Sequence, residues 1–263
     1  MLILLPPSEG KTAPRRGRPL DLDRLSFREL APARAELLAA LVETCTTDDP
    51  SGLERAVEVL GIGKTLAGEV ARNAELPRAA TARADKVYSG VLFEALDLPS
   101  LPASARRRAT SWVAITSALF GLVRPADPIP AYRLSGDVSL PRTGGTAGFW
   151  RDRLDPVVSR AAGSGVVVDL RSTTYAAFWR PADRLADRVV TVRVLHEVDG
   201  TRKVVSHFNK ATKGRIVRAM LEDGGRPTSP KKLAVHLQDL GWNVELGAPG
   251  RHGTPLDVVV QDL

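Results

Sequence analysis

The sequence predicts a single α/β domain, and three observations lead to that fold class. Short apolar runs, typical of buried strands, recur along the chain between segments that carry apolar residues at helical spacing. The length of 263 residues suits one α/β domain. Neither a repeat, nor a low-complexity linker, nor a change of composition divides the chain, so we expect one mixed domain over 1–263.

The first third is predicted to hold one strand followed by helices. Residues 1–5 form an apolar run that Pro6 and Pro7 end, as in a buried strand that leads into a loop. The Pro- and Arg-rich stretch 14–18 is predicted to be an exposed loop. Helical spacing of leucine and valine predicts helices over 26–40 and 51–60, with an acidic turn between them.

The remaining elements follow from the same two periodicities. Apolar runs predict strands over 112–115 and 166–170, and the Pro- and Gly-rich stretch 124–148 between them is predicted to be ordered by packing or by function. The later predictions are strands over 188–198 and 202–208 joined by an Asp199-Gly200 turn, a helix over 210–221 capped by Asn209, a helix over 233–240, and strands over 242–246 and 256–260.

Composition excludes several classes of protein. A single cysteine, Cys45, rules out an internal disulfide, zinc clusters of the CxxC type and iron–sulfur sites. The four histidines lack metal-binding spacing, so we expect neither a metal nor a cofactor. The first apolar run is too short for a signal peptide and none is long enough to cross a membrane, which predicts a cytoplasmic protein without a membrane partner.

A glycine turn between two predicted helices is the first candidate site. Gly61, Ile62, Gly63 and Lys64 have the layout of a helix-hairpin-helix over about 51–74, in which glycines and free amides approach a nucleic-acid phosphate and the lysine adds a charge. An ordinary interhelical turn explains the same residues equally well. A nucleotide-binding P-loop is excluded, because no glycine lies five positions before Gly10 or Gly63.

Two basic segments could contact phosphates. Residues 202–221 contain no acidic residue, and Lys210, Lys213 and Arg215 are placed near the expected start of a helix, where an anion would also meet backbone amides. A solvated basic face is the alternative. Arg124 and Arg133 lie in a proline-stiffened segment with the aromatics Phe120 and Tyr132, and such a set could grip a phosphate and stack a base. Arg124 and Asp127 could instead form a buried salt bridge.

Polar side chains that follow two predicted strands suggest catalysis. Ser8, Glu9 and Lys11 come after the first strand, and Arg171 and Tyr175 come after the strand over 166–170. Since α/β proteins bind ligands at the carboxyl ends of strands, these five residues are candidates for a carboxylate base beside an anion clamp. The simpler alternative is that Glu9 only pairs with Lys11 or with another cation.

Four segments resemble the peroxide stress protein YaaA family, in order and spacing, over nearly the whole chain. They are MLILLPPSEGKT, TSALFGLVRPADPIPAYRLSG, VVVDLRSTTYAAFW and VSHFNKATKGRIVRAML. The opening differs from the Ser-Pro-Ala-Lys of the better-known branch, and Arg171-Ser172-Thr173 replaces its Ala-Ser-Asp-like stretch. The resemblance implies a compact α/β fold of unusual topology with a helix-hairpin-helix, a basic cleft that binds DNA, and a role in peroxide stress linked to lower free iron.

The function we expect is a largely sequence-independent DNA-binding protein that protects or helps repair DNA during hydrogen peroxide stress. Its partner would be double-stranded or damaged DNA, held at Gly61, Gly63, Lys64, Arg124, Arg133, Lys210, Lys213 and Arg215. The alternative is an enzyme whose basic cleft takes a nucleotide-like small molecule, a damaged base or a nucleic-acid end. A third possibility is an interaction protein that does not touch nucleic acid, because a net charge of +7 is modest and basic patches also bind acidic proteins.

Overall fold

The strand that opens the chain lies in the interior of the sheet, between two strands from distant parts of the sequence. The computed structural model describes residues 1–198, 201–203 and 206–261. In it, β1 (Leu2–Leu5) pairs in parallel with β3 (Val113–Ser117) on one side and with β8 (Val167–Asp169) on the other. Four consecutive aliphatic side chains suit this place, because a parallel strand covered on both faces has no solvent side.

The sheet is mixed and has eight strands within the described residues. Its order is β11-β12-β9-β8-β1-β3-β4, with β10 added on the free part of β9. The strands from β12 to β3 are parallel to their neighbours, whereas β4, β10 and β11 are antiparallel additions. The bounds not yet given are β4 (Gly121–Val123), β9 (Val189–Val198), β10 (Thr201–Lys203), β11 (Val244–Leu246) and β12 (Thr254–Val260).

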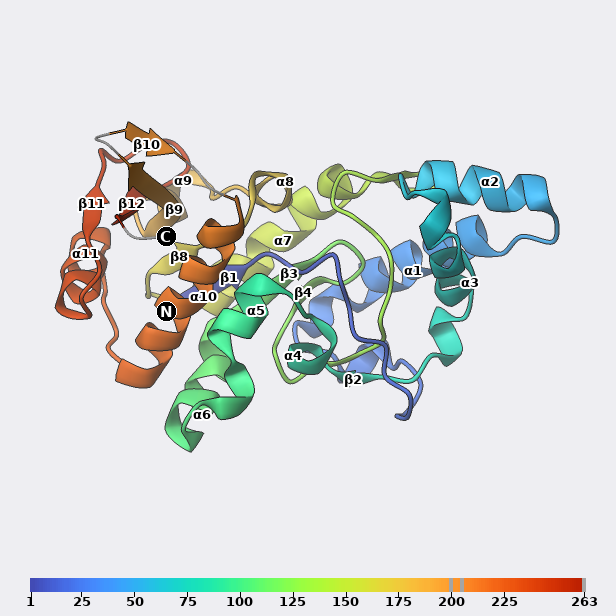
Figure 1. The fold of residues 1–263 in the computed structure, drawn as a ribbon, viewed down its shortest axis with the longest axis horizontal. Coiled ribbons are helices and arrows are strands. Elements are labelled where there is room, and N and C mark those ends of the chain that lie inside the picture. The colour runs from blue at the N-terminus through green and yellow to red at the C-terminus, as the bar shows by residue number, and fades with distance from the viewer. Residues whose placement is uncertain (199–200, 204–205, 262–263) are drawn as a thin grey trace.

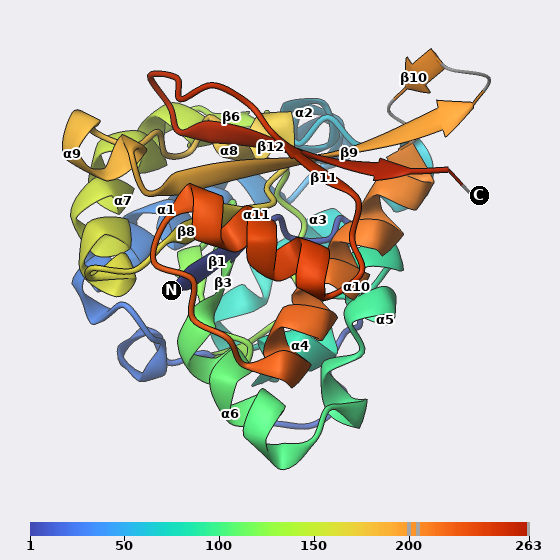
Figure 2. The ribbon, with the colours of Figure 1, turned by 90° about the vertical axis from the view of Figure 1, so that its left-hand side faces the viewer.

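Helices cover both faces of this sheet. Figure 2 shows the central strands between α7 on one side and α5 and α10 on the other, and Figure 1 shows α2 and α3 at the far end of the long axis. The α-helices are α1 (Ala31–Cys45), α2 (Pro50–Val59), α3 (Gly68–Ala74), α4 (Ala84–Val87), α5 (Val91–Leu96), α6 (Ala103–Trp112), α7 (Thr146–Ala162), α8 (Thr173–Ala176), α9 (Asp183–Ala186), α10 (Ser206–Asp223) and α11 (Pro230–Asp239).

Shorter elements complete the fold. Two small antiparallel pairs lie outside the main sheet, and single turns of 3-10 helix precede or follow several helices. The strands are β2 (Ala82–Arg83), β5 (Pro128–Ile129), β6 (Ser139–Leu140) and β7 (Gly144–Gly145), and the 3-10 turns are η1 (Leu22–Arg24), η2 (Arg28–Leu30), η3 (Lys64–Leu66), η4 (Leu76–Arg78) and η5 (Leu98–Ser100).

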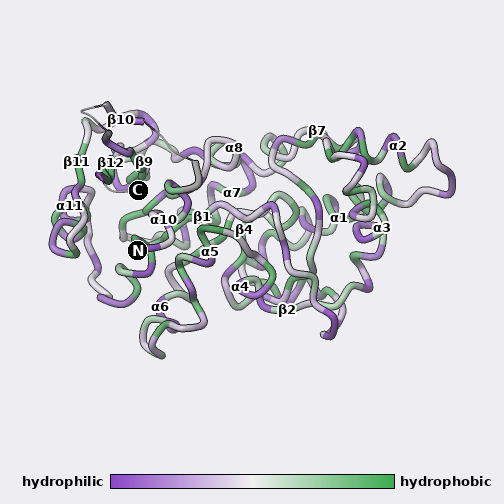
Figure 3. The backbone as a smooth tube through the Cα atoms, viewed as in Figure 1, coloured by the Kyte–Doolittle hydropathy of each residue, from purple (hydrophilic) through white to green (hydrophobic). Residues whose placement is uncertain are grey.

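The core follows the apolar runs of the sequence. All residues of β1, β3 and β8 are buried, and the central strands are coloured mostly as hydrophobic in Figure 3. Trp150 of α7 is fully buried and donates its indole N–H to the carbonyl oxygen of Ala118 at 2.7 Å. Phe178 and Trp179 are buried as well, so these aromatics serve packing.

Most predicted strands and helices are confirmed, within a few residues at their ends, but one prediction is wrong. Residues 206–208 do not continue the strand expected over 202–208, because α10 begins at Ser206. Asn209 therefore lies inside the helix and does not cap it, and Lys210 and Lys213 are not in its first turn. The expected turn at Asp199-Gly200 lies outside the described residues.

Gly214 allows α10 to lie directly on α5. A Cβ atom at this position would overlap the carbonyl oxygen of Leu92, and it would come within 2.9 Å of the Cβ of Ala95. The two helices therefore approach each other over the backbone of α5. This contact fixes α10 against the sheet and carries Lys213 toward the end of β8. No helix among the described residues is long and apolar enough to span a bilayer.

Candidate functional site at the ends of strands β1 and β8

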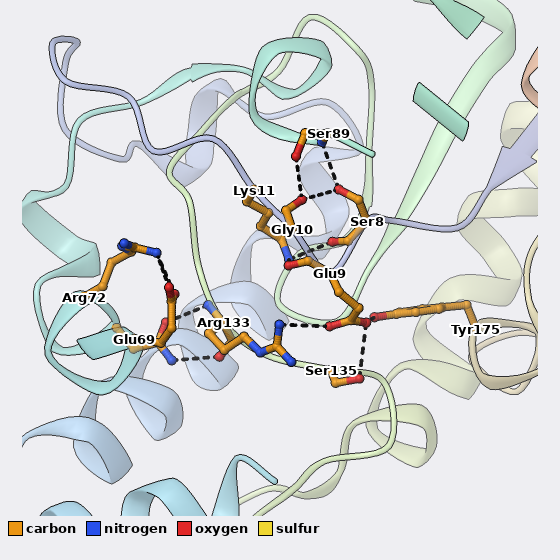
Figure 4. Close-up of polar contacts among 11 residues, drawn as sticks. Ser8, Glu9, Gly10, Lys11, Glu69, Arg72, Ser89, Arg133, Ser135 and Tyr175 are labelled. Atoms are coloured by element: carbon orange, nitrogen blue, oxygen red, sulfur yellow. Dashed lines mark hydrogen bonds and ion pairs between the residues drawn. The ribbon is translucent and has the colours of Figure 1, made fainter. Parts of the chain in front are cut away.

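The loop that follows β1 is folded on itself and anchored to the segment after α4. Ser8 donates its hydroxyl to the carbonyl oxygen of Gly10 at 2.6 Å, and its Oγ accepts the backbone N–H of Ser89 at 3.0 Å. Ser89 in turn donates its hydroxyl to the carbonyl oxygen of Gly10 at 3.1 Å. Ser8, a candidate catalytic residue, is thus engaged in holding the loop in shape, as Figure 4 shows.

Lys11 points its ammonium back under this loop. Its Nζ donates to the carbonyl oxygens of Ser8 at 2.9 Å and of Glu9 at 3.4 Å, and lies 4.3 Å from the centre of the Tyr132 ring. Burial lowers the pKa of Lys11 to about 8, and the positive charge of Arg133 acts in the same direction, against the carboxylates of Glu9 and Glu69. Near physiological pH the protonated form of Lys11 still predominates, but a minor fraction of the amine is neutral, far more than for an exposed lysine.

Two buried tyrosines form the floor below Lys11. The hydroxyls of Tyr88 and Tyr132 are 2.9 Å apart, and the Tyr132 hydroxyl lies 2.7 Å from the Oγ of Ser117 at the end of β3. Desolvation raises the pKa of Tyr88 to about 12 and that of Tyr132 well above 10, so both phenols stay protonated. Their rings form cation–π contacts with the Lys11 ammonium and provide no negative charge to pair with it.

Glu9 reaches outward over three groups from two other segments. One of its carboxylate oxygens lies 3.4 Å from the hydroxyls of Ser135 and Tyr175, and the other lies 3.6 Å from the Arg133 guanidinium. The Glu9 side chain is 49% exposed, so these long contacts leave it open to a ligand. The cation that pairs with Glu9 is Arg133, whereas Lys11 contacts only the backbone oxygen of Glu9 (Figure 4).

Arg171 lies below the surface and is held by the protein. Its guanidinium makes a two-point ion pair with Asp169, with N–O distances of 2.9 and 2.7 Å, and also donates to the carbonyl oxygens of Tyr175 and Trp179. Burial opposes ionisation of Asp169, yet the charge and hydrogen bonds of Arg171 bring its pKa below the ordinary value. Because Arg171 grips the backbone of Tyr175, it is a positioning residue for the hydroxyl that faces Glu9.

Lys213 joins α10 to the same strand end. It is 8% exposed and donates its ammonium to the carbonyl oxygen of Leu170 at 3.0 Å. Burial lowers its pKa, while the nearby Asp169 carboxylate acts against that shift. Lys210 and Arg215 are instead exposed, and within the described ranges neither has a hydrogen-bond or ion-pair partner. The three predicted cations therefore do not share one surface patch.

The glycine turn after α2 lies outside this cluster. The amide of Ile62 donates to the carbonyl oxygen of Val57 at 3.2 Å and that of Gly61 to Glu58 at 3.0 Å, with Gly61 at φ 60°. These two hydrogen bonds form the Schellman motif that ends many helices, and the motif explains the glycine at position 61 without any ligand. At Gly68, the first residue of α3, a Cβ would meet no atom within 4 Å, so no close approach requires this glycine.

The guanidinium of Arg124 is already bound by other groups of the protein. Arg124 donates to the carbonyl oxygen of Val113 at 2.8 Å, its guanidinium lies over the Phe27 ring, and burial lowers its pKa to about 10. Asp127 accepts the backbone N–H of Arg124 and two bonds from Ser26, so it fixes the turn without the side-chain salt bridge that was the alternative.

Arg133, beside Glu9, has a hydrogen-bond donor without a partner among the described residues. Its backbone N–H and carbonyl are both bonded to the amide side chain of Asn73, at 2.9 and 2.7 Å, which places the residue against α3. Its side chain is 23% exposed, and the buried Nε has no hydrogen-bond partner among the described residues. Because this Nε is closed to solvent, a ligand with anionic oxygens would instead meet the exposed part of the Arg133 side chain.

The structure thus brings five predicted residues together and leaves others apart. Ser8, Glu9, Lys11, Arg133 and Tyr175 form one cluster, with Arg171 beneath it. Sequence reasoning missed Tyr88, Ser89, Ser117, Ser135 and Asn73, which carry no local signal because they come from separate segments. Tyr132 was expected to be available for base stacking, but it is 2% exposed and forms the floor instead. No group of three or more His, Cys, Asp or Glu residues in the described part could hold a metal ion.

Comparison with known proteins shows one family over the whole chain. A family model described as peroxide stress protein YaaA matches residues 1–245. A UPF0246 protein of Streptomyces coelicolor is 51% identical over 265 residues and covers all of both chains. A UPF0246 protein of Corynebacterium glutamicum is 42% identical over 222 residues, covering 84% of each chain, and one of Cereibacter sphaeroides is 30% identical over 233 residues, covering 85% of this chain and 87% of its own.

Proposed function

The chain belongs to the peroxide stress protein YaaA family, and from that premise we propose that it binds double-stranded or damaged DNA largely without regard to sequence. The binding would protect DNA, or help repair it, during hydrogen peroxide stress in the cytoplasm, in connection with lower free iron. The family membership supports the role in peroxide stress, and the chemistry of the surface supports the DNA contact.

The observation that carries the proposal is a row of free amides in the turn between α2 and α3. The N–H groups of Gly63, Lys64 and Thr65 have no acceptor within the described residues, and all three residues are exposed. Buried Ile62 pins the turn from below. Exposed amides next to a lysine suit a backbone phosphate, so α2, this turn and α3 would act as a helix-hairpin-helix.

The remaining contacts would come from exposed cations on either side of the Glu9 cluster. Figure 1 places α3, which follows the turn that contains Lys64, on one side of β1, and α10, which contains Lys210, on the other. Lys210 and Arg215 are exposed and would meet phosphates together with the amides of Gly63 and Lys64, and Arg133 would join them from beside Glu9. Gly61, whose amide donates to Glu58, would shape the turn that presents these amides. Arg124 and Lys213 are committed to carbonyl oxygens, and we assign them to support of this surface.

A titration of DNA binding against salt tests the proposal. Fluorescence anisotropy with duplex, single-stranded and gapped DNA should give micromolar or tighter binding, and about five phosphate contacts predict a log–log salt slope of roughly −4.5 on duplex DNA. Lys64→Ala and Lys210→Ala should each flatten the slope by about one. Lys231→Ala is the matched control, because α11 lies at the opposite end of the molecule from α2 (Figure 1).

A salt-independent affinity, or equal effects of all three variants, would refute the DNA proposal.

The second candidate function is an enzyme that acts on a nucleotide, a damaged base or a nucleic-acid end. The open carboxylate of Glu9 beside the partly neutral amine of Lys11 favours it, since a binding surface for phosphates has no use for a carboxylate in its centre.

A further inference from the structure

We propose that Lys11 is a nucleophile that forms an imine with the aldehyde of an abasic deoxyribose in DNA. Glu9 then removes the C2′ proton of that sugar, and the resulting elimination breaks the strand. The inference rests on the proposed DNA binding and names the chemistry of its central cluster. The juxtaposition that carries it is an amine and an open carboxylate on one loop, with an unsatisfied arginine beside them.

The surroundings of Lys11 are those of a reactive amine. Its Nζ contacts two backbone carbonyls and the Tyr132 ring, and no carboxylate oxygen lies within ion-pair distance of it among the described residues. Buried charges are ordinarily paired, whereas the partners of the Lys11 ammonium are carbonyl oxygens and an aromatic ring. Desolvation over a tyrosine floor instead favours the neutral, nucleophilic form.

The charged groups around Lys11 come from three segments. Glu9 belongs to its own loop, Arg133 to the segment that passes α3, and Glu69 to α3 itself, where it is paired with Arg72 at 2.5 Å. Because Arg72 neutralises Glu69, the carboxylate left to act near the amine is Glu9. The hydroxyl of Tyr175, whose backbone Arg171 holds, lies 3.4 Å from that carboxylate and offers Glu9 a weak hydrogen bond.

The reaction is balanced without an oxidant or a metal. The Lys11 amine adds to C1′ of the ring-opened sugar, the carbonyl oxygen leaves as water, and a protonated imine remains. Glu9 removes a proton from C2′, and the electron pair released there expels the 3′ phosphate as the C3′–O bond breaks. Arg133 is placed to donate hydrogen bonds to the anionic oxygens of the departing phosphate. Water then hydrolyses the imine, which returns the amine and releases an unsaturated aldehyde.

Borohydride trapping tests the imine directly. The full-length protein is mixed with duplex DNA that contains one abasic site, reduced with borohydride, and run on a denaturing gel, and the adduct is mapped by proteolysis and mass spectrometry. We expect the adduct on Lys11. Lys11→Arg should lower the trapped fraction at least about tenfold, whereas Lys86→Ala, an exposed lysine of α4, should leave it unchanged.

Mapping on the parent protein keeps the test valid even if Lys11→Arg folds poorly. Glu9→Gln should still be trapped but should cleave the strand about a hundredfold more slowly. DNA with a tetrahydrofuran abasic analogue has no aldehyde, so it should bind in anisotropy without forming an adduct. Failure of that binding refutes the proposed function itself and is thereby distinguished from failure of the imine chemistry.

Two further outcomes would overturn the inference while DNA binding stands. The first is an adduct that maps to residues other than Lys11. The second is an adduct at Lys11 with glyceraldehyde 3-phosphate but not with abasic DNA, which would assign the amine to a small anionic aldehyde. A normal rate of strand cleavage by Glu9→Gln would remove the carboxylate from the mechanism.

Discussion

Replacement of Arg171 by methionine should lower the free energy of unfolding by several kcal/mol. The Arg171 side chain is 2% exposed and that of Asp169 8%, so Arg171→Met leaves a buried carboxylate without its cation. Removal of one partner from a buried ion pair costs about 3–5 kcal/mol of unfolding free energy. At about 2–4 °C per kcal/mol for a chain of this size, Tm should fall by about 6–20 °C.

The sheet provides a matched control in Arg193. Its guanidinium makes the same two-point contact with Asp257, at 2.6 Å for both bonds, but the Arg193 side chain is 57% exposed. Solvent screening limits such a surface pair to less than about 1 kcal/mol. Urea denaturation followed by circular dichroism should therefore separate Arg171→Met from Arg193→Met clearly.

Equal and small losses in the two variants would refute this reasoning. Such a result would mean that the Asp169 carboxylate is rehydrated or repartnered when Arg171 is absent, for example by Lys213 from α10. It would also remove the argument that Arg171 positions Tyr175, because a segment that relaxes so easily could not hold a hydroxyl in place.

Two further predictions concern Lys11 and Gly214. Between a folded pKa of about 8 and the ordinary 10.5, the unfolded chain binds more protons at Lys11 than the folded chain, so the stability of the parent relative to Lys11→Met should rise with pH in that range. Urea denaturation at pH values on either side of 8 measures this, and a difference independent of pH would contradict the lowered pKa. Gly214→Ala should cost about 1–3 kcal/mol, because the new methyl group would displace α10 from the Leu92 carbonyl. A thermal melt measures that loss, and an unchanged Tm would show that α5 yields without cost.

The strands could be predicted because their apolar runs are continuous and are bounded by proline, glycine or charge. The helix α7 could not, since Pro156 lies inside it and interrupts the expected pattern. The start of α10 was misplaced because Asn209 is a strong capping residue in isolation, whereas the helix already begins at Ser206.

The site was predictable in its location but not in its roles. Polar residues after β1 and β8 had to meet at one sheet edge, because parallel neighbours end together. Burial decided the rest. Arg171 and Arg133 are equal as sequence letters, yet Arg171 is fully bonded to the protein and Arg133 retains an unpaired Nε. Tyr88 could not be found, since nothing in its neighbourhood along the chain marks it.

The central place of β1 has a consequence for how the chain folds on the ribosome. Leu2 pairs with Val167 and Ile3 with Val113, so β1, once synthesised, lacks its second neighbour until Val167 has also emerged. During that time four aliphatic residues and their unpaired backbone are open to chaperones or to other nascent chains. Folding should therefore be slow for the size of the domain, and the N-terminal strand should be the last to gain protection from hydrogen exchange on both of its edges.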